Sequence, residues 1–142
     1  MNSVERQDDE TRELGLADNN GATILVVEDD ADVRIAVVQI LELSGYRVLS
    51  ARDGHEALAA LRDNPGIDLV FSDLVMPEGM SGLELVREAQ RLRPDLKILL
   101  TSGYSARAVL GDSGPDLPLI KKPYRLAEVV RRIGEVLGRR SS

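Results

Sequence analysis

The chain has 142 residues, of which 43% are hydrophobic and 30% charged, and its formal net charge at pH 7 is −6. This length suits one domain with a sizeable core, and the acidic balance argues against nucleic-acid binding, which needs a basic surface. The chain has no cysteine, which excludes disulfides and thiolate metal sites. No apolar run approaches the ~20 residues of a membrane span, and the polar N-terminus lacks the apolar core of a signal peptide. We therefore expect a cytoplasmic protein without a membrane partner.

The pattern of apolar and turn residues predicts one domain over residues 22–138, in which short strands alternate with helices. A polar and charged stretch over 1–21 predicts a flexible extension before it, and a short tail covers 139–142. The predicted strands cover residues 23–28, 46–50, 68–72, 97–101 and 119–121. The predicted helices cover residues 31–43, 54–62, 83–93 and 125–137, with a further short helix within 104–110.

Five strands that alternate with helices indicate an α/β fold with a parallel sheet covered on both faces. Because such crossovers are right-handed, the pattern favours a doubly wound five-stranded sheet in the order 2-1-3-4-5. Asp30 precedes the helix over 31–43, and we expect it to cap that helix rather than to bind a metal. Ser44 and Gly45 then end the helix in the way that glycine commonly does.

Four of the predicted strands lead into side chains that can do chemistry. These are Glu28 and Asp29 after the first strand, Asp73 after the third, Thr101 at the end of the fourth and Lys122 after the fifth. In an open α/β sheet, ligands bind outside the carboxyl ends of the strands, so we expect these side chains to meet in one crevice. Taken singly, each residue is explained as a helix cap or a loop residue. Together, however, acids, a hydroxyl and a lysine at four strand ends favour a functional site over four unrelated caps and loop residues.

Three carboxylates that meet in one crevice repel one another. At about 4 Å and an effective dielectric constant of about 20, each like-charged pair costs roughly 4 kcal/mol. Either protonation or a cation must relieve this repulsion, and oxygen ligands without nearby His or Cys favour Mg²⁺. Asp73 is then a candidate nucleophile that forms an aspartyl phosphate. Lys122 would supply a positive charge to the phosphoryl group, and the Thr101 hydroxyl a hydrogen bond.

Several motifs occur in a fixed order along the chain. They are Ile24-Leu-Val-Val-Glu-Asp-Asp30, Ser72-Asp-Leu-Val-Met-Pro77, Met80-Ser-Gly-Leu-Glu84, Leu99-Leu-Thr-Ser-Gly-Tyr104 and Ile120-Lys-Lys-Pro-Tyr124. Over residues 22–138 the chain resembles the receiver domain of two-component response regulators, which implies the flavodoxin-like receiver fold. The resemblance implies a single-domain phosphoacceptor in a phosphorelay. The Thr-Ser-Gly-Tyr stretch and the short helix are also similar to receivers of hybrid sensor kinases.

The resemblance implies a role for each acid of the crevice. Asp73 would receive a phosphoryl group from a histidine kinase or a histidine phosphotransfer protein. The implied ligands of Mg²⁺, or of Mn²⁺ as its substitute, are Glu28, Asp29, Asp73 and the backbone carbonyl of Val75. Glu28 stands where the family more often has Asp. The protein would not be an enzyme beyond catalysing its own phosphorylation and dephosphorylation.

The resemblance also implies a conformational switch. Thr101 is the implied switch hydroxyl, Lys122 the phosphate-binding lysine, and the bond before Pro123 is expected to be cis. Leu119 stands where the family often has an aromatic residue, and Tyr124 where it often has Phe. Phosphorylation would alter the surface made by residues 104–110, 119–121 and 125–137, which an unknown downstream protein, or a second copy in a homodimer, would bind.

Three alternative interpretations stay open. A haloacid-dehalogenase-like phosphatase needs a second acid two residues after the nucleophile, where this chain has Val75. A flavodoxin-like FMN binder needs a loop rich in Ser, Thr and Gly after the first strand, where Glu28, Asp29 and Asp30 would repel phosphate. The third is a receiver-shaped interaction module that is never phosphorylated, which the full set of site residues disfavours.

Overall fold

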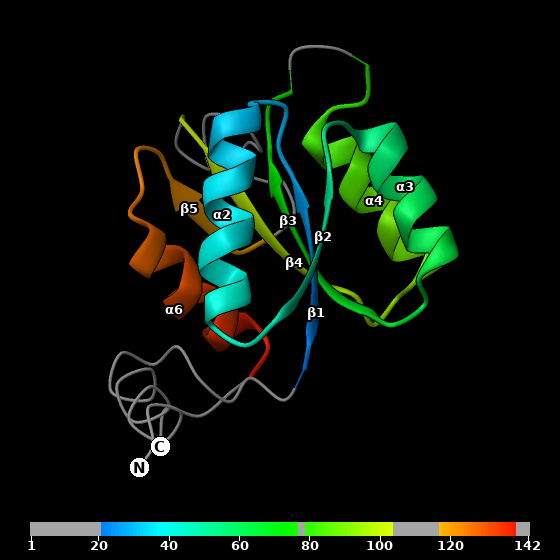
Figure 1. Ribbon diagram of the computed structural model, residues 1–142. Helices are drawn as coiled ribbons and strands as arrows, with labels where there is room; N and C mark the ends of the chain where they lie inside the picture. The colour runs from blue at the N-terminus through cyan, green and yellow to red at the C-terminus, as the bar shows by residue number, and fades with distance from the viewer. Residues whose placement is uncertain (1–20, 77–78, 104–116, 139–142) are drawn as a thin grey trace.

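The computed structural model describes residues 21–76, 79–103 and 117–138, which form a sheet between two layers of helices (Figure 1). The strands are β1 (Thr23–Val27), β2 (Arg47–Ala51), β3 (Ile67–Asp73), β4 (Lys97–Ser102) and β5 (Leu119–Lys121). The helices are α2 (Ala31–Leu43), α3 (Gly54–Asp63), α4 (Gly82–Leu92) and α6 (Leu126–Val136).

All strand pairs are parallel and the strand order is β2-β1-β3-β4-β5, which confirms the predicted doubly wound fold. The register places Asp73, the last residue of β3, opposite Thr101 of β4. It also places Val27, the last residue of β1, opposite Ser72. The carboxyl ends of β1, β3 and β4 therefore meet at one edge of the sheet, at the top of Figure 1.

The two faces of the sheet are covered by different helices. Helices α2 and α6 lie on one face, and α3 and α4 lie side by side on the other (Figure 1). Because both faces are covered, residues 24–26 of β1 are fully buried although their side chains alternate between the faces. This is why β1, β3 and β4, the three central strands, contain continuous apolar runs rather than alternating patterns.

Side-chain caps at the starts of α2 and α4 fix the loops beside the site. The Asp30 carboxylate accepts hydrogen bonds from the backbone N–H groups of Asp32 and Val33 at 2.9 and 3.1 Å, which confirms its predicted capping role. Ser81 and Glu84 form a reciprocal capping box at the start of α4. Such caps satisfy backbone N–H groups that lack partners within the helix, and so they set where each helix starts.

The observed element boundaries differ from the predicted ones by at most one residue at each end, and α2 and β5 match their predicted bounds. Asp73 is the last residue of β3 rather than the first residue of the loop. Leu126 begins α6 and is 37% exposed, so the buried side chains of this helix are Val129, Val130 and Ile133. The predicted short helix within 104–110 lies outside the described residues, as do residues 1–20 and the tail over 139–142.

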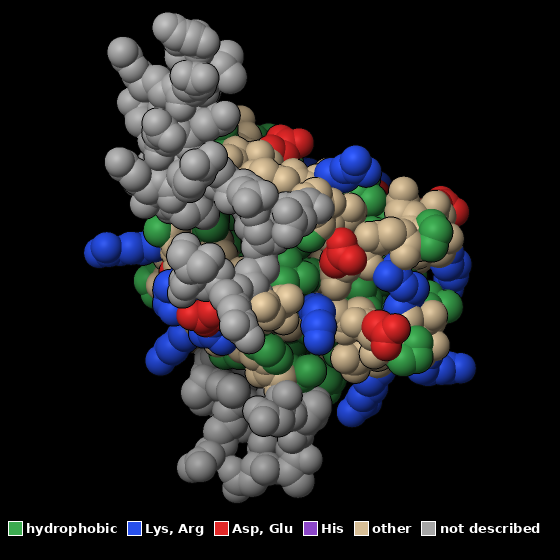
Figure 2. Space-filling view, turned by 90° about the horizontal axis from the view of Figure 1, so that it is seen from below, with side chains coloured by type: hydrophobic (Ala, Val, Ile, Leu, Met, Phe, Trp, Pro, Cys, Tyr) green, Lys and Arg blue, Asp and Glu red, His purple; other side chains and the backbone are tan. Residues whose placement is uncertain are grey.

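The opposite edge of the sheet carries a mixed surface. Figure 2 shows this face, where basic side chains are interspersed with acidic and apolar ones. A groove of about 320 Å³ lies here, lined by the starts of β1, β2 and β3 and by residues 63–66. It is therefore separate from the carboxyl edge. Within the described ranges, no helix has the length and apolar character needed to cross a membrane.

Candidate functional site

Three carboxylates meet at the carboxyl edge of the sheet. Glu28 and Asp29 follow β1, and Asp73 ends the neighbouring strand β3. Each offers one oxygen atom, and these three oxygens lie within 4.8 Å of one another. Glu28 is buried, Asp73 half-buried and Asp29 exposed, so the cluster can be reached from solvent. A donor set made only of carboxylate oxygens fits a hard divalent cation such as Mg²⁺ or Mn²⁺.

Glu28 is the least exposed acid of the cluster, at 6%. Burial raises the pKa of its carboxyl group, and the nearby Asp29 and Asp73 act in the same direction. The backbone N–H of Asp30, which donates to Glu28 Oε2 at 3.0 Å, and the charge of Lys122 oppose this rise. Burial is the largest cause, so the raised pKa reflects mainly the cost of keeping this carboxylate charged away from solvent.

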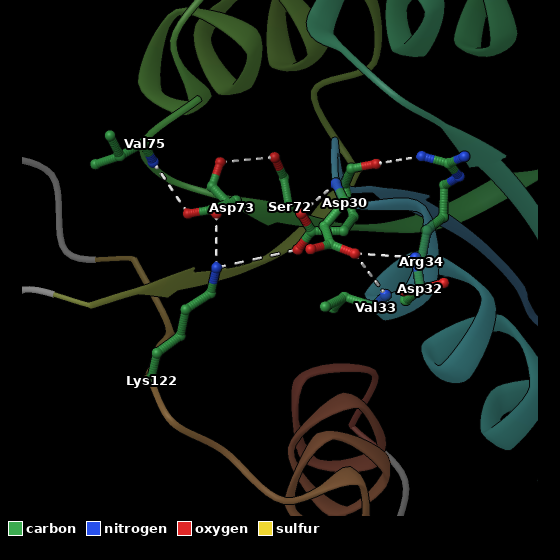
Figure 3. Close-up of polar contacts among 9 residues, drawn as sticks. Asp30, Asp32, Val33, Arg34, Ser72, Asp73, Val75 and Lys122 are labelled. Atoms are coloured by element: carbon green, nitrogen blue, oxygen red, sulfur yellow. Dashed lines mark hydrogen bonds and ion pairs between the residues drawn. The ribbon is translucent and has the colours of Figure 1, made fainter. Parts of the chain in front are cut away.

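Lys122 lies directly against Asp73. Its Nζ donates a hydrogen bond to Asp73 Oδ2 at 2.7 Å and lies 4.0 Å from Glu28 Oε1. Burial lowers the pKa of Lys122, but the hydrogen bond to Asp73 and the negative charges of Asp73 and Glu28 outweigh burial, so the pKa is raised. Lys122 is therefore protonated at neutral pH and held where it stabilises negative charge at Asp73 (Figure 3).

Backbone hydrogen bonds join the carboxyl ends of β3, β4 and β5, which carry Asp73, Thr101 and Lys122. The N–H of Leu74 donates to the carbonyl of Thr101, and the N–H of Lys122 donates to the carbonyl of Ser102, both at 2.7 Å. The N–H of Val75 donates to Asp73 Oδ1 at 3.2 Å. Thr101 is buried, and the strand register places it opposite Asp73. The proposed contacts of its hydroxyl and of the Val75 carbonyl stay predictions, because they concern a bound phosphoryl group and a bound cation.

The residues after β5 pack against the core beneath the site. The Lys122–Pro123 peptide bond is cis, as the resemblance implies. The Tyr124 ring meets Phe71 of β3 edge to face, with centroids 6.2 Å apart. Burial raises the pKa of Tyr124, and the negative charge of Glu28 adds to the rise. Leu119 is partly buried against the core on the other face of the sheet, and its part in a switch stays a prediction.

The sequence did not single out three further contacts that hold the site. The Ser72 hydroxyl donates to the Asp73 carbonyl at 3.0 Å, and Arg34 Nη1 donates to the Glu28 carbonyl at 2.8 Å. Gly82 lies so close to the strand end that an added Cβ would fall 2.6 Å from Leu74 Cα. Two of these contacts reach backbone carbonyls, which no side-chain pattern reveals; the glycine within the Met80-Ser-Gly motif was the available signal for the third.

The family comparison decides the identity of the domain. Residues 24–133 match the response regulator receiver domain. The chain belongs to this family. Receiver domains are components of two-component systems, in which they interact with kinases and downstream partners.

Among curated proteins, this receiver domain is similar to the response regulator receiver protein CpdR of Brucella abortus (strain 2308). The two are 40% identical over 116 residues, which cover 80% of this chain and 95% of CpdR. The chain is also 37% identical over 122 residues to the sensor kinase CckA of the same organism, covering 84% of this chain but 13% of CckA. The domain therefore resembles both a single-domain regulator and one part of a kinase.

Solved receiver domains share the fold. A CheY-like receiver domain protein from Methanospirillum hungatei JF-1 superposes with a TM-score of 0.72 at 32% identity, covering 84% of this chain and 95% of that chain. The receiver domain of the hybrid histidine kinase CckA gives a TM-score of 0.69, also at 32% identity, and covers 82% of this chain and 99% of that chain. Both likenesses extend over nearly the whole of each solved chain.

Proposed function

We propose that this receiver domain is a phosphoacceptor in a two-component or phosphorelay system, and that Asp73 is the residue phosphorylated. The observation that supports this most is the position of the Asp73 carboxylate. Its oxygen lies within 4.8 Å of oxygens of Glu28 and Asp29, and Asp73 Oδ2 accepts a hydrogen bond from the ammonium group of Lys122 at 2.7 Å. A carboxylate that has both a cation-binding cluster and a lysine beside it suits transfer of a highly charged phosphoryl group.

The carboxylates of Glu28, Asp29 and Asp73, with the backbone carbonyl of Val75, would hold Mg²⁺ or Mn²⁺. When bound, the ion offsets negative charge on the carboxylates and on the phosphoryl oxygens. The donor set fits such an ion because it consists of hard oxygen atoms on two neighbouring strand ends. Lys122 adds the positive charge that the chain itself provides.

In the proposed transfer, an Asp73 oxygen forms a bond to phosphorus as the P–N bond of a phosphohistidine breaks. The electron pair of that bond leaves with the imidazole nitrogen, which takes up a proton from solvent. Lys122 then pairs with a phosphoryl oxygen instead of with Asp73 Oδ2, and the Thr101 hydroxyl donates to another. The domain thus catalyses its own phosphorylation and dephosphorylation, and it turns over no other substrate.

The donor would be a histidine kinase or a histidine phosphotransfer protein. Phosphorylation would bias a two-state equilibrium through Thr101, with Leu119 and Pro123 in the conformational path. The affected surface would include β5, α6 and residues 104–110, the last of which lie outside the described residues. A downstream protein or a second copy of the domain would bind this surface in the cytoplasm, and no nucleic acid is expected to bind.

Labelling by acetyl phosphate with Mg²⁺ tests the assignment of Asp73. Intact-mass spectrometry should show one added phosphoryl group on the wild type and none on Asp73→Asn. Asp95→Asn, an exposed acid in the loop before β4, is the matched control and should label like the wild type. Equal labelling of Asp73→Asn would refute the assignment. No labelling of the wild type by acetyl phosphate or by a phosphohistidine donor would favour an interaction module that is never phosphorylated.

A further inference from the structure

One arginine of α2 holds the backbone between the two acids that follow β1. Arg34 Nη1 donates a hydrogen bond to the backbone carbonyl of Glu28 at 2.8 Å. That carbonyl belongs to the peptide that links Glu28 to Asp29, so its orientation affects both acids. In Figure 3 Arg34 approaches from the side opposite to Lys122.

This contact closes a short network of hydrogen bonds. The Asp30 N–H donates to Glu28 Oε2 at 3.0 Å, and the Asp30 carboxylate caps α2. The backbone N–H of Arg34 donates to the Asp30 carbonyl at 2.9 Å. Arg34 is therefore bound to the loop by its backbone and by its side chain. The network joins the first turn of α2 to the loop that carries the acidic pair.

Helix stability alone does not explain an arginine at this position. Arg34 is the fourth residue of α2, and a positive charge in the first turn opposes the helix dipole. Its half-buried side chain also points back toward the loop instead of into solvent. A residue that breaks a local preference beside a site is expected to have a role there. The planar guanidinium group offers donors in fixed directions, which suits holding a carbonyl.

We propose that Arg34 is a positioning residue, which fixes the Glu28–Asp29 peptide so that the two acids are arranged for a divalent cation before the cation binds. This inference rests on the proposed function of the same site. Groups that orient metal ligands without touching the metal commonly change metal affinity by about 10–100-fold when they are removed.

The positioning role and a purely electrostatic role predict opposite effects on cation affinity. Arg34→Met removes a positive charge near a cation site, so electrostatics alone predicts equal or tighter binding. Loss of positioning predicts weaker binding. Arg91→Met is the matched control, because Arg91 is an exposed arginine of α4 that pairs with Glu88 away from the site.

The test is direct Mn²⁺ binding, measured by electron paramagnetic resonance of free Mn²⁺ on the full chain without any phosphoryl donor. We expect the dissociation constant of Arg34→Met to rise by about tenfold. Arg34→Lys, which keeps the charge and can donate to the same carbonyl, should recover most of the affinity, and Arg91→Met should match the wild type. If Arg34→Met does not fold by circular dichroism, Arg34→Gln replaces it with the same expectation.

Equal or tighter Mn²⁺ binding by the folded Arg34 variant would overturn the inference while leaving the proposed function intact. Reduced thermal stability with unchanged Mn²⁺ affinity would also overturn it, because Arg34 would then serve the helix alone. Failure of the wild type to bind Mn²⁺ would overturn the proposed metal site together with this inference.

Discussion

Asp73 and Lys122 stabilise each other at a strand edge where three carboxylates would otherwise repel. The 2.7 Å hydrogen bond between them orients the Asp73 side chain, and the N–H of Val75 holds its other oxygen. The sequence predicted the acids and the lysine because each follows a strand, and the topology dictates that such ends converge. The contact of Arg34 with the site could not be predicted from the sequence, because its partner is a backbone carbonyl.

The raised pKa of Glu28 has a consequence for stability in the absence of divalent cations. Between the ordinary value of 4.5 and its higher value in the folded protein, the folded state binds more protons than the unfolded state. The free energy of unfolding therefore falls as pH rises through that window, and the loss persists at pH 7. We expect Glu28→Gln to raise the free energy of unfolding at pH 7 in EDTA and to flatten this part of the pH profile.

Urea unfolding from pH 4 to pH 8 in EDTA measures this effect. Glu42→Gln, an exposed acid of α2, is the matched control and should follow the wild type. With saturating Mg²⁺ the wild type should have a higher free energy of unfolding than Glu28→Gln, because it gains binding energy that the variant loses. A destabilised Glu28→Gln variant in EDTA would mean that the Asp30 hydrogen bond and Lys122 outweigh burial.

Some strands and helices around the site could be predicted from the sequence more accurately than others. The strands and the long helices were predictable, because covered parallel strands are continuous apolar runs and Asp30 marks a helix start. Their ends were less predictable, because one more hydrogen-bonded residue changes the energy little. The approach of α4 to the end of β3 at Gly82 is a packing contact between two segments. In the sequence, the glycine that this contact requires is the only indication of it.

Because α4 approaches the end of β3 closely at Gly82, we expect Gly82→Ala to lower the free energy of unfolding, whereas a matched control glycine should raise it. Gly82→Ala would place a methyl group 2.6 Å from Leu74 Cα, so we expect a loss of about 2 kcal/mol in the free energy of unfolding. The contact involves backbone atoms, which cannot turn aside as a side chain can. Phosphorylation should also slow, because the residue after Asp73 must shift.

Gly134→Ala is the control for this substitution. Gly134 lies within α6, and an added Cβ there would meet no side chain or backbone within 4 Å apart from its chain neighbours and the nearby backbone of its own helix, so alanine should stabilise the protein by about 0.5–1 kcal/mol. Urea unfolding midpoints measure both variants. A neutral Gly82→Ala would show that α4 can move away from the strand end without cost, and so does not fix the loop.

At the scale of the whole molecule, the strand order creates the site. Neighbouring positions of β1 and β3 bring together acids that are 44 and 45 residues apart in the sequence, and β5 brings Lys122 to them. The alternation of strands and helices was enough to predict this arrangement, because right-handed crossovers leave few strand orders. The surface that a partner would bind was less predictable, because partner recognition depends on side-chain shape over several elements.

The most direct test of the central claim is to locate the phosphoryl group and its cation dependence in one experiment. The wild type is incubated with a phosphohistidine donor in Mg²⁺ or in EDTA, the acyl phosphate is trapped by borohydride reduction, and the peptides are mapped by mass spectrometry. We predict modification of the single peptide that contains Asp73, in Mg²⁺ only. Modification at another residue, or equal modification in EDTA, would contradict a cation-dependent aspartyl phosphate at the edge of this sheet.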